Sequence, residues 1–277
     1  MIEKKYGIIG KTLSHSLSPK LHNFWFKKNK LKAHYSLIEI EKNQIKDIIN
    51  KIKSKKLNGI NVTIPYKQEV IPYLDLIIND AKETSSINTI YLNDENKIVG
   101  ENTDVYGFEK SFIHKFNSQD LEGKNFLILG AGGVTPSLIY ALEKIKIKKI
   151  FVSNRTMQKA ENIKKKFSFI EIISWEKVFK KSEDMDVIIN ATSLGMKNSI
   201  DFDQLIKRFK SDLIYYDVVY NPLETKMLKN FKESKVKTFN GLEMFIFQGQ
   251  KSFYLWNNIT PRVDEEVKKE IISNLSQ

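Results

Sequence analysis

Three glycines in the middle of the chain have the spacing of a turn that binds pyrophosphate. The segment KNFLILGAGGVTPSLIYAL reads as a buried strand, a tight turn over Gly130, Ala131, Gly132 and Gly133, and a helix. Glycine is needed where the backbone turns sharply and where an anion must approach main-chain N–H groups at the positive end of a helix. The segment lies in a βαβ unit that continues to a second strand, KKIFVSN. These residues predict a dinucleotide site; a glycine turn used only for packing is the alternative.

The end of the second strand indicates which dinucleotide is bound. An NAD site usually has an acidic residue there for the ribose 2′-hydroxyl, whereas an NADP site needs cationic or neutral donors for the 2′-phosphate. This chain has Asn154, Arg155 and Thr156, with Lys159 one turn later and no acid before Glu161. Arg155 can make a flat, charge-assisted contact with phosphate. We therefore expect NADP; in the alternative, Thr156 only caps a helix and Arg155 is only solvated.

A later strand, DVIINAT, ends in small and hydroxyl residues before Gly195. The carboxyl ends of strands line the ligand crevice of an open α/β sheet, and small residues there leave room for a flat ring. We expect a nicotinamide ring beside this strand end, although an ordinary loop would have a similar composition.

Polar residues also follow strands in the N-terminal part of the chain. Ser18 precedes Pro19 and could be no more than a helix N-cap, but a cap leaves Ser16 unexplained. The pattern predicts that Lys67 lies at the start of a helix, where the positive helix end disfavours a cation, and this placement points to a functional use. The polar residues at these strand ends and turns are Ser16, Ser18, Asn61, Thr63, Lys67, Asn88 and Asp104.

The elements that must position these residues alternate along the chain. Short β-branched runs alternate with amphipathic helical stretches, a pattern typical of an α/β fold with mainly parallel sheets. The exception is SINTIYLNDENKIVGENT, which predicts an antiparallel hairpin and hence a mixed sheet in the first domain. The runs that predict strands are YGIIG, HYSLIEI, GINVTI, FLILG, IFVSN, DVIINAT and LIYYDVV.

Composition excludes several classes of protein. No stretch approaches the roughly 18 apolar residues of a membrane helix, and the N-terminus lacks the apolar core of a secretory signal, so we expect a cytoplasmic protein without membrane contact. The absence of cysteine excludes disulfides and thiolate catalysis. The net charge of +12 comes almost entirely from lysine, which favours a solvated basic surface over a nucleic-acid site. No metal is expected, since the spacing of the four histidines fits none: His15, His22, His34 and His114.

Nine segments together resemble the successive motifs of the shikimate dehydrogenase family. They follow the family's order and extend over nearly the whole chain. The resemblance implies a two-domain α/β enzyme with an N-terminal mixed-sheet substrate domain and a Rossmann NADP domain. The segments are SHSLSPKLHN, GINVTIPYKQEV, SINTI, GENTDVYGF, LGAGGV, SNRT, INATSLGM, YDVVYNPLET and NGLEMFIFQGQKSFYLW.

The resemblance also implies roles for individual residues. It makes Lys67 and Asp104 the catalytic pair at the ring hydroxyl that is oxidised. The implied substrate-binding residues are Ser16 and Ser18 at the carboxylate, Tyr220 beside it, and Thr63, Asn88 and Gln248. The implied cofactor-binding residues are the glycine turn, Asn154, Arg155 and Thr156 at the adenosine end, and Thr192, Gly241 and Met244 near the nicotinamide.

Two positions depart from the family pattern. Thr135 stands where the glycine fingerprint usually has its small third residue, which puts close packing of the following helix in doubt. Asn240 stands where an acid is common before Gly241, and we expect little consequence.

The implied reaction is reversible, NADPH-dependent reduction of 3-dehydroshikimate to shikimate, a step of aromatic amino-acid biosynthesis. Hydride arriving at a carbonyl carbon leaves negative charge on the oxygen, which Lys67 would stabilise while Asp104 orients it. One rival is a relative that prefers quinate or NAD; another is a catalytically silent NADP-binding regulator that reaches nucleic acid. We expect a monomer or homodimer with a substrate domain over residues 1–104 and 241–277, and a Rossmann domain over 105–240.

Overall fold

The computed structural model describes residues 3–195 and 208–275. The chain divides into two compact units, one formed by residues 1–107 and 246–277 and the other by residues 108–245. We call them unit 1 and unit 2. Two helices, α4 (Asp104–Ser111) and α10 (Leu242–Asn257), each begin in one unit and end in the other.

Unit 1 is built on a mixed six-stranded sheet. Its strands are β1 (Lys4–Gly10), β2 (Ala33–Glu39), β3 (Gly59–Val62), β4 (Leu76–Ile77), β5 (Thr89–Leu92) and β6 (Ile98–Glu101), in the order β2-β1-β3-β5-β6-β4. Strands β1, β2 and β3 are parallel, whereas β5 is antiparallel to both β3 and β6. The β5–β6 pair is the predicted hairpin, and the side chain of Asn93 closes it by accepting the N–H groups of Glu95 and Lys97. The expected mixed sheet is therefore confirmed.

The helices of unit 1 bury periodic apolar faces. In α2, Ile45, Ile48, Ile49 and Ile52 are buried, a spacing that places them on one side of the helix. They pack with strand residues such as Ile60 in a single apolar cluster. The α-helices other than α4 and α10 are α1 (Ser18–Lys28), α2 (Ile45–Lys53), α3 (Asp80–Thr84) and α11 (Glu265–Ile272), and 3-10 turns lie at Lys42–Gln44 and Ile71–Tyr73.

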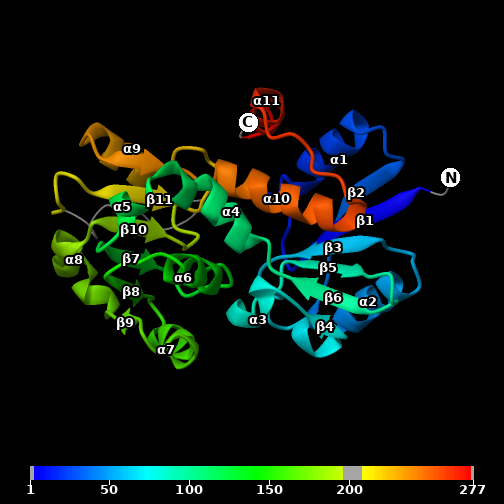
Figure 1. Ribbon diagram of the computed structural model, residues 1–277, viewed down its shortest axis with the longest axis horizontal. Coiled ribbons are helices and arrows are strands. Elements are labelled where there is room, and N and C mark those ends of the chain that lie inside the picture. The colour runs from blue at the N-terminus through cyan, green and yellow to red at the C-terminus, as the bar shows by residue number, and fades with distance from the viewer. Residues whose placement is uncertain (1–2, 196–207, 276–277) are drawn as a thin grey trace. The chain divides into compact units, whose positions relative to one another are not determined.

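Unit 2 is a parallel α/β unit. Its strands are β7 (Asn125–Leu129), β8 (Lys149–Ser153), β9 (Glu171–Ile172), β10 (Val187–Asn190), β11 (Ile214–Asp217) and β12 (Lys237–Phe239). They lie in the order β12-β11-β10-β7-β8-β9, and every pair is parallel (Figure 1). Its helices are α5 (Ser118–Leu121), α6 (Thr135–Glu143), α7 (Met157–Lys166), α8 (Val178–Lys181) and α9 (Lys226–Glu233), with 3-10 turns at Ile113–Lys115, Trp175–Lys177 and Ser182–Asp184.

The central strands of unit 2 carry continuous apolar runs, as is typical of a parallel sheet that is buried on both faces. Phe126, Leu127, Ile128 and Leu129 of β7 are all buried. Among the described residues, no helix is both long and apolar enough to cross a membrane.

A histidine is buried in the aromatic core of unit 1. His22 is fully buried, stacks on Tyr35 at 4.5 Å between ring centroids, and lies near Trp25, Phe253 and Trp256. Neither ring nitrogen has a hydrogen-bond partner in the described part of the chain. Burial lowers the pKa of His22 to about 3, so the ring is neutral in the folded protein.

Replacing His22 by Phe is expected to reduce the sensitivity of the fold to acid. Between about pH 6.5 and pH 3 the unfolded chain binds a proton at His22 that the folded chain does not, so the free energy of unfolding falls as the pH is lowered. The loss between pH 7.5 and pH 5 should be smaller by about 2 kcal/mol in the variant. Urea unfolding followed by tryptophan fluorescence measures it, and equal losses in both proteins would contradict the neutral buried ring.

Candidate functional site

Lys67 and Asp104 form a largely buried ion pair in unit 1. The distance from Lys67 Nζ to Asp104 Oδ2 is 2.5 Å, and the two side chains are 12% and 9% exposed. The low exposure distinguishes the pair from the surface ion pairs of this chain, such as Lys42 with Glu69. The pair is therefore not an ordinary surface ion pair.

The predicted helix at Lys67 is wrong, because Lys67 lies in a series of turns between β3 and the 3-10 turn at Ile71–Tyr73. Pro72 has no N–H to offer the carbonyl of Gln68, which accepts the N–H of Ile71 instead, so a helix cannot extend through the segment. The carbonyl of Lys67 accepts the N–H of Ile87 at 2.8 Å. This bond fixes the lysine backbone beside the residue that precedes Asn88.

Asp104 is fixed by its position at the first residue of α4. The side-chain oxygen of Asn102 accepts the N–H groups of Asp104 and Val105, which starts the helix at that residue. A carboxylate in the first turn is favoured by the positive end of the helix. Asp104 therefore lies where its negative charge is stabilised.

Asn88 connects the aspartate to the sheet of unit 1. The N–H of Thr103 donates to Asn88 Oδ1 at 2.7 Å, which identifies the amide oxygen. The amide nitrogen then donates to Asp104 Oδ1 and to the hydroxyl of Thr103, both at 2.9 Å. Asn88, Asp104 and Lys67 thus form one chain of hydrogen bonds.

Below this chain lies a buried hydroxyl cluster that sequence reasoning missed. Ser252 Oγ lies 2.8 Å from Thr89 Oγ1, 3.2 Å from Thr103 Oγ1 and 2.9 Å from the amide nitrogen of Asn61, which donates to it. Thr103 and Ser252 fall inside motifs quoted above, but only the pairing of their strands and helices shows that they meet. Asn102 carried a usable signal, since asparagine often accepts the backbone N–H groups two and three residues later at the start of a helix.

The other predicted substrate residues of unit 1 lie beside the ends of α1 and β3 and in the interior of α10. The hydroxyls of Ser16 and Ser18 are 3.3 Å apart. Leu17, not Ser18, occupies the N-cap of α1, and no side chain caps that helix, so an N-cap role does not explain Ser18. Thr63 follows β3 and donates its N–H to Ile9 of β1. Gln248 lies on α10 one turn before Ser252, and its carbonyl accepts the Ser252 hydroxyl.

The glycine turn of unit 2 has the conformation that its sequence requires. Gly130 follows β7 with φ +111°, and a Cβ there would lie 2.8 Å from the carbonyl oxygen of Ala191. A Cβ on Gly132 would meet nothing within 4 Å. The fold therefore requires glycine at position 130. At position 132 no protein atom would contact the Cβ of an alanine. Gly133 follows and leads into α6.

Thr135 does not disturb the close packing of α6, which its size had put in doubt. Its side chain is fully buried at the first residue of α6, and its hydroxyl donates to the carbonyl of Gly130 at 3.0 Å. The threonine therefore reinforces the turn instead of loosening the helix.

The residues after β8 are uncharged or cationic and accessible. Asn154 Oδ1 accepts the N–H of Ala131 at 3.1 Å, which joins this segment to the glycine turn. Arg155 and Lys159 are exposed. Thr156 occupies the N-cap of α7, but its side chain makes no capping bond, so the hydroxyl is not used by the helix.

The remaining predicted cofactor residues also lie in unit 2. Thr192 follows β10 and donates its hydroxyl to Asn190 Oδ1 at 2.6 Å. Gly241 donates its N–H to the carbonyl of Val219, and a Cβ on it would lie 2.0 Å from the carbonyl oxygen of Val218, so only glycine fits. Met244 is buried on α10. Tyr220, a predicted substrate-binding residue, also lies in unit 2, where it stacks on Phe245 at 4.3 Å. Met196, the last residue of the INATSLGM motif, lies outside the described residues.

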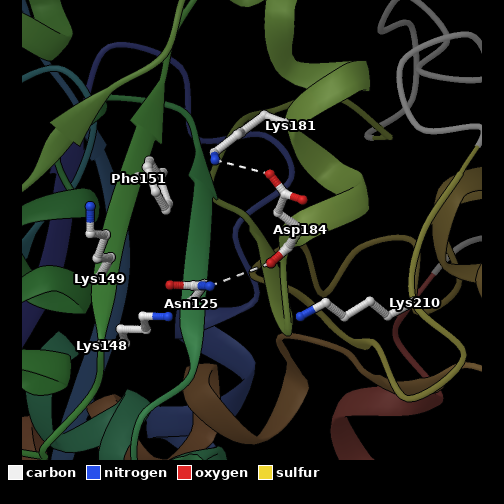
Figure 2. Close-up of a pocket in the computed structure, with 7 residues that line it drawn as sticks. All are labelled: Asn125, Lys148, Lys149, Phe151, Lys181, Asp184 and Lys210. Carbon is white, nitrogen blue, oxygen red and sulfur yellow. Dashed lines mark hydrogen bonds and ion pairs between the residues drawn. The ribbon is translucent and has the colours of Figure 1, made fainter.

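A lysine-lined pocket lies at the amino-terminal ends of β7 and β8 in unit 2, whereas the glycine turn lies at the carboxyl-terminal end of β7. Asn125 and Lys149 begin these two strands. Figure 2 shows the pocket with the Lys181–Asp184 ion pair at its border. Lys149 and Lys210 pair with Glu171 and Asp186, each at 2.6 Å. Because carboxylates already compensate most of its lysines, we do not include this pocket in the candidate site.

Comparison with known proteins gives the same family over both units. The model of the "Shikimate dehydrogenase substrate binding domain" matches residues 8–90, and that of "Shikimate / quinate 5-dehydrogenase" matches residues 113–219. A relative from Pelagibacter ubique, named shikimate dehydrogenase (NADP(+)), is 46% identical over 265 residues, which cover 96% of this chain and 97% of that protein.

Two solved structures agree with this result. A crystal structure of shikimate dehydrogenase in complex with NADP+ has a TM-score of 0.89 and 34% identity, covering 99% of this chain and 96% of that one. The enzyme from Thermus thermophilus, in complex with NADP(H) and shikimate, has a TM-score of 0.82 and 26% identity, covering 99% and 100% of the two chains. Together with the matched domains, these similarities show that the chain belongs to the shikimate dehydrogenase family.

Proposed function

We propose that this chain catalyses the reversible, NADPH-dependent reduction of 3-dehydroshikimate to shikimate. Unit 1 would act as the substrate domain and unit 2 as the NADP domain, close to the expected division into residues 1–104 with 241–277 and residues 105–240. Its partner is the small-molecule substrate, and we propose a cytoplasmic enzyme that is a monomer or homodimer. The observation that carries the proposal is the ion pair of Lys67 with Asp104, held in place by Asn88.

The ion pair leaves hydrogen-bonding capacity for a substrate. An ammonium group has three donors, and one of those on Lys67 goes to Asp104, so two remain for a carbonyl or hydroxyl oxygen. Each carboxylate oxygen of Asp104 can accept a further bond besides those from Lys67 and Asn88. Ser16, Ser18 and the other polar groups at strand ends offer neutral hydroxyls, which suit a substrate carboxylate better than an acid would.

The residues of unit 2 fit an NADP molecule. Gly132 has free space where a side chain would obstruct a pyrophosphate, and the glycine turn leads directly into α6. Asn154, Arg155, Thr156 and Lys159 present amide, hydroxyl and cationic groups and no carboxylate, a donor set for a 2′-phosphate. We propose that these residues hold the adenosine end and that Thr192, Gly241 and Met244 lie near the nicotinamide.

The residues of unit 1 would lower the barrier to carbonyl reduction. NADPH supplies the hydride. Lys67 places positive charge within hydrogen-bond reach of the oxygen, where negative charge develops, and its ammonium can donate a proton there. Asp104 orients the lysine and accepts a bond from a neighbouring ring hydroxyl. Asn88 prevents the carboxylate from turning away, since its own orientation is fixed by Thr103.

Initial rates on two acids and two cofactors test the proposal against its rivals. We expect oxidation of shikimate with NADP+ to have the highest kcat/KM among the combinations of shikimate or quinate with NADP+ or NAD+. A preference for quinate or NAD+ would identify the rival enzyme of the family. Lack of turnover with all four combinations, together with tight NADP+ binding, would favour the silent regulator.

Replacing Lys67 by Met is expected to lower kcat about 100-fold or more while KM for shikimate changes little, because charge stabilisation acts mainly in the transition state. Steady-state kinetics at saturating NADP+ measure both constants. Lys53→Met, at an exposed position of α2, is the matched control and should keep the wild-type rate. A near-normal kcat for Lys67→Met would remove the assignment.

The two glycines are expected to separate folding from cofactor binding. Gly130→Ala introduces a side chain at positive φ against the Ala191 carbonyl, so it should lower the thermal unfolding midpoint. Gly132→Ala meets no protein atom and should leave the midpoint unchanged, but it should weaken NADP+ binding roughly tenfold by holding the pyrophosphate away from the backbone. Calorimetric titration that finds unchanged affinity in Gly132→Ala would contradict the proposed placement.

Arg155 is expected to determine the preference for NADP over NAD. Arg155→Ala removes a charge-assisted bond to the 2′-phosphate, so kcat/KM for NADPH should fall about 10-fold to 100-fold. The value for NADH, which lacks that phosphate, should stay within about twofold. Parallel loss for both cofactors would show that Arg155 acts elsewhere.

A further inference from the structure

Unit 2 contains a buried carboxylate that the proposed mechanism does not use. Asp217 ends β11, is fully buried, and lies opposite Asn190 of β10 in the strand register. Its Oδ1 accepts the amide N–H of Asn190 and the backbone N–H of Val219, both at 3.0 Å. Its Oδ2 accepts the hydroxyls of Thr225 at 2.7 Å and Tyr215 at 3.2 Å. Burial raises the pKa of Asp217 to about 6, and the hydrogen bonds partly offset this rise.

All four donors to Asp217 are uncharged, so no cation compensates the carboxylate within this set of contacts. A buried carboxylate without a counter-charge is costly to keep ionised. A neutral amide could not replace it, because an amide has only one oxygen while four donors converge on this position. The arrangement therefore requires an acid here, and the cost indicates that its orienting effect is used.

The orienting effect passes through Asn190 to Thr192. The backbone N–H of Thr192 donates to Asn190 Oδ1 at 3.1 Å, which identifies the amide oxygen. The amide nitrogen of Asn190 then faces two acceptors, Asp217 Oδ1 and the carbonyl of Leu194, each at 3.0 Å. Asp217 thus holds the Asn190 amide in a single orientation.

Asn190 in turn fixes the hydroxyl of Thr192. Thr192 Oγ1 donates its proton to Asn190 Oδ1 and accepts the backbone N–H of Leu194 at 3.0 Å. A hydroxyl has one proton and two lone pairs, so only one acceptor position remains on this oxygen. Any ligand that binds it must bring the donor.

We propose that Asp217 is a positioning residue that, through Asn190, fixes the Thr192 hydroxyl as an acceptor for the N–H₂ group of the nicotinamide carboxamide. This inference rests on the proposed function, in which Thr192 lies near the nicotinamide. The amide group of the cofactor supplies the donor that the oxygen lacks. This hydrogen bond would fix the orientation of the carboxamide and of the nicotinamide ring that carries it.

Binding of two ligands tests the proposal without turnover. Calorimetric titrations use NADP+ and 2′-phospho-ADP-ribose, which keeps the adenosine end and lacks the nicotinamide. Asp217→Asn should weaken NADP+ binding roughly fivefold to tenfold and leave 2′-phospho-ADP-ribose within about twofold. Tyr216→Phe is the matched control, since it removes the neighbouring buried hydroxyl of β11, which bonds to Ser111, and should leave both affinities unchanged.

A double-mutant cycle shows whether the effect passes through Thr192. Thr192→Val should reproduce the loss for NADP+, and adding Asp217→Asn should cause no further loss. Thr192→Ser should restore the affinity. Additive losses, equal losses for both ligands, or wild-type NADP+ affinity in Thr192→Val would each overturn the inference.

A cofactor analogue keeps the test valid if Asp217→Asn fails to fold. In the 3-acetylpyridine analogue of NADP+ a methyl ketone replaces the carboxamide, so the N–H₂ donor is absent. Thr192→Val should then bind the analogue as well as the wild type does, and a loss equal to that for NADP+ would overturn the inference. Wild-type protein that binds neither NADP+ nor 2′-phospho-ADP-ribose would instead refute the proposed cofactor, and this inference with it.

Discussion

The chemistry proposed for this chain depends on holding one carboxylate in a fixed position. Asp104 is almost buried, and it stays in place because the start of α4, the amide of Asn88 and the ammonium of Lys67 all favour its negative charge. Each of these supports comes from a different part of unit 1. The proposed catalytic pair is therefore a property of the folded sheet and helix and not of any one motif.

The two units use the same device to orient a polar group. In unit 1 the backbone N–H of Thr103 fixes the amide of Asn88, which then donates to Asp104. In unit 2 the backbone N–H of Thr192 fixes the amide of Asn190, which then donates to Asp217. An asparagine whose oxygen is held by the backbone can present its nitrogen in only one direction. Such a side chain gives a carboxylate a defined neighbour without adding charge.

Sequence patterns predicted the parts of this structure that depend on local composition. The apolar runs of β7, β8 and β10, the hairpin of β5 and β6, and the glycine turn all have short-range signals, and they are where the sequence predicted them. The two-residue strands β4 and β9 are too short to give a periodic signal, and they form because a neighbouring strand supplies their hydrogen bonds. Pro65 precedes Lys67 at a position typical of a helix start, but Pro72 prevents a helix from extending through the segment. The roles of Thr103, Ser252 and Asp217 could not be predicted, since they depend on which distant side chains meet after folding.

The most direct measurement of the central claim follows the absorbance of NADPH after 3-dehydroshikimate is added to the purified wild-type protein. We expect NADPH to disappear in an amount equal to the shikimate formed, as quantified by chromatography, and we expect the reaction to run backward from shikimate and NADP+. NADPH that binds but is not consumed in the presence of 3-dehydroshikimate would contradict the account. The pair of Lys67 and Asp104 would then not promote reduction of this carbonyl.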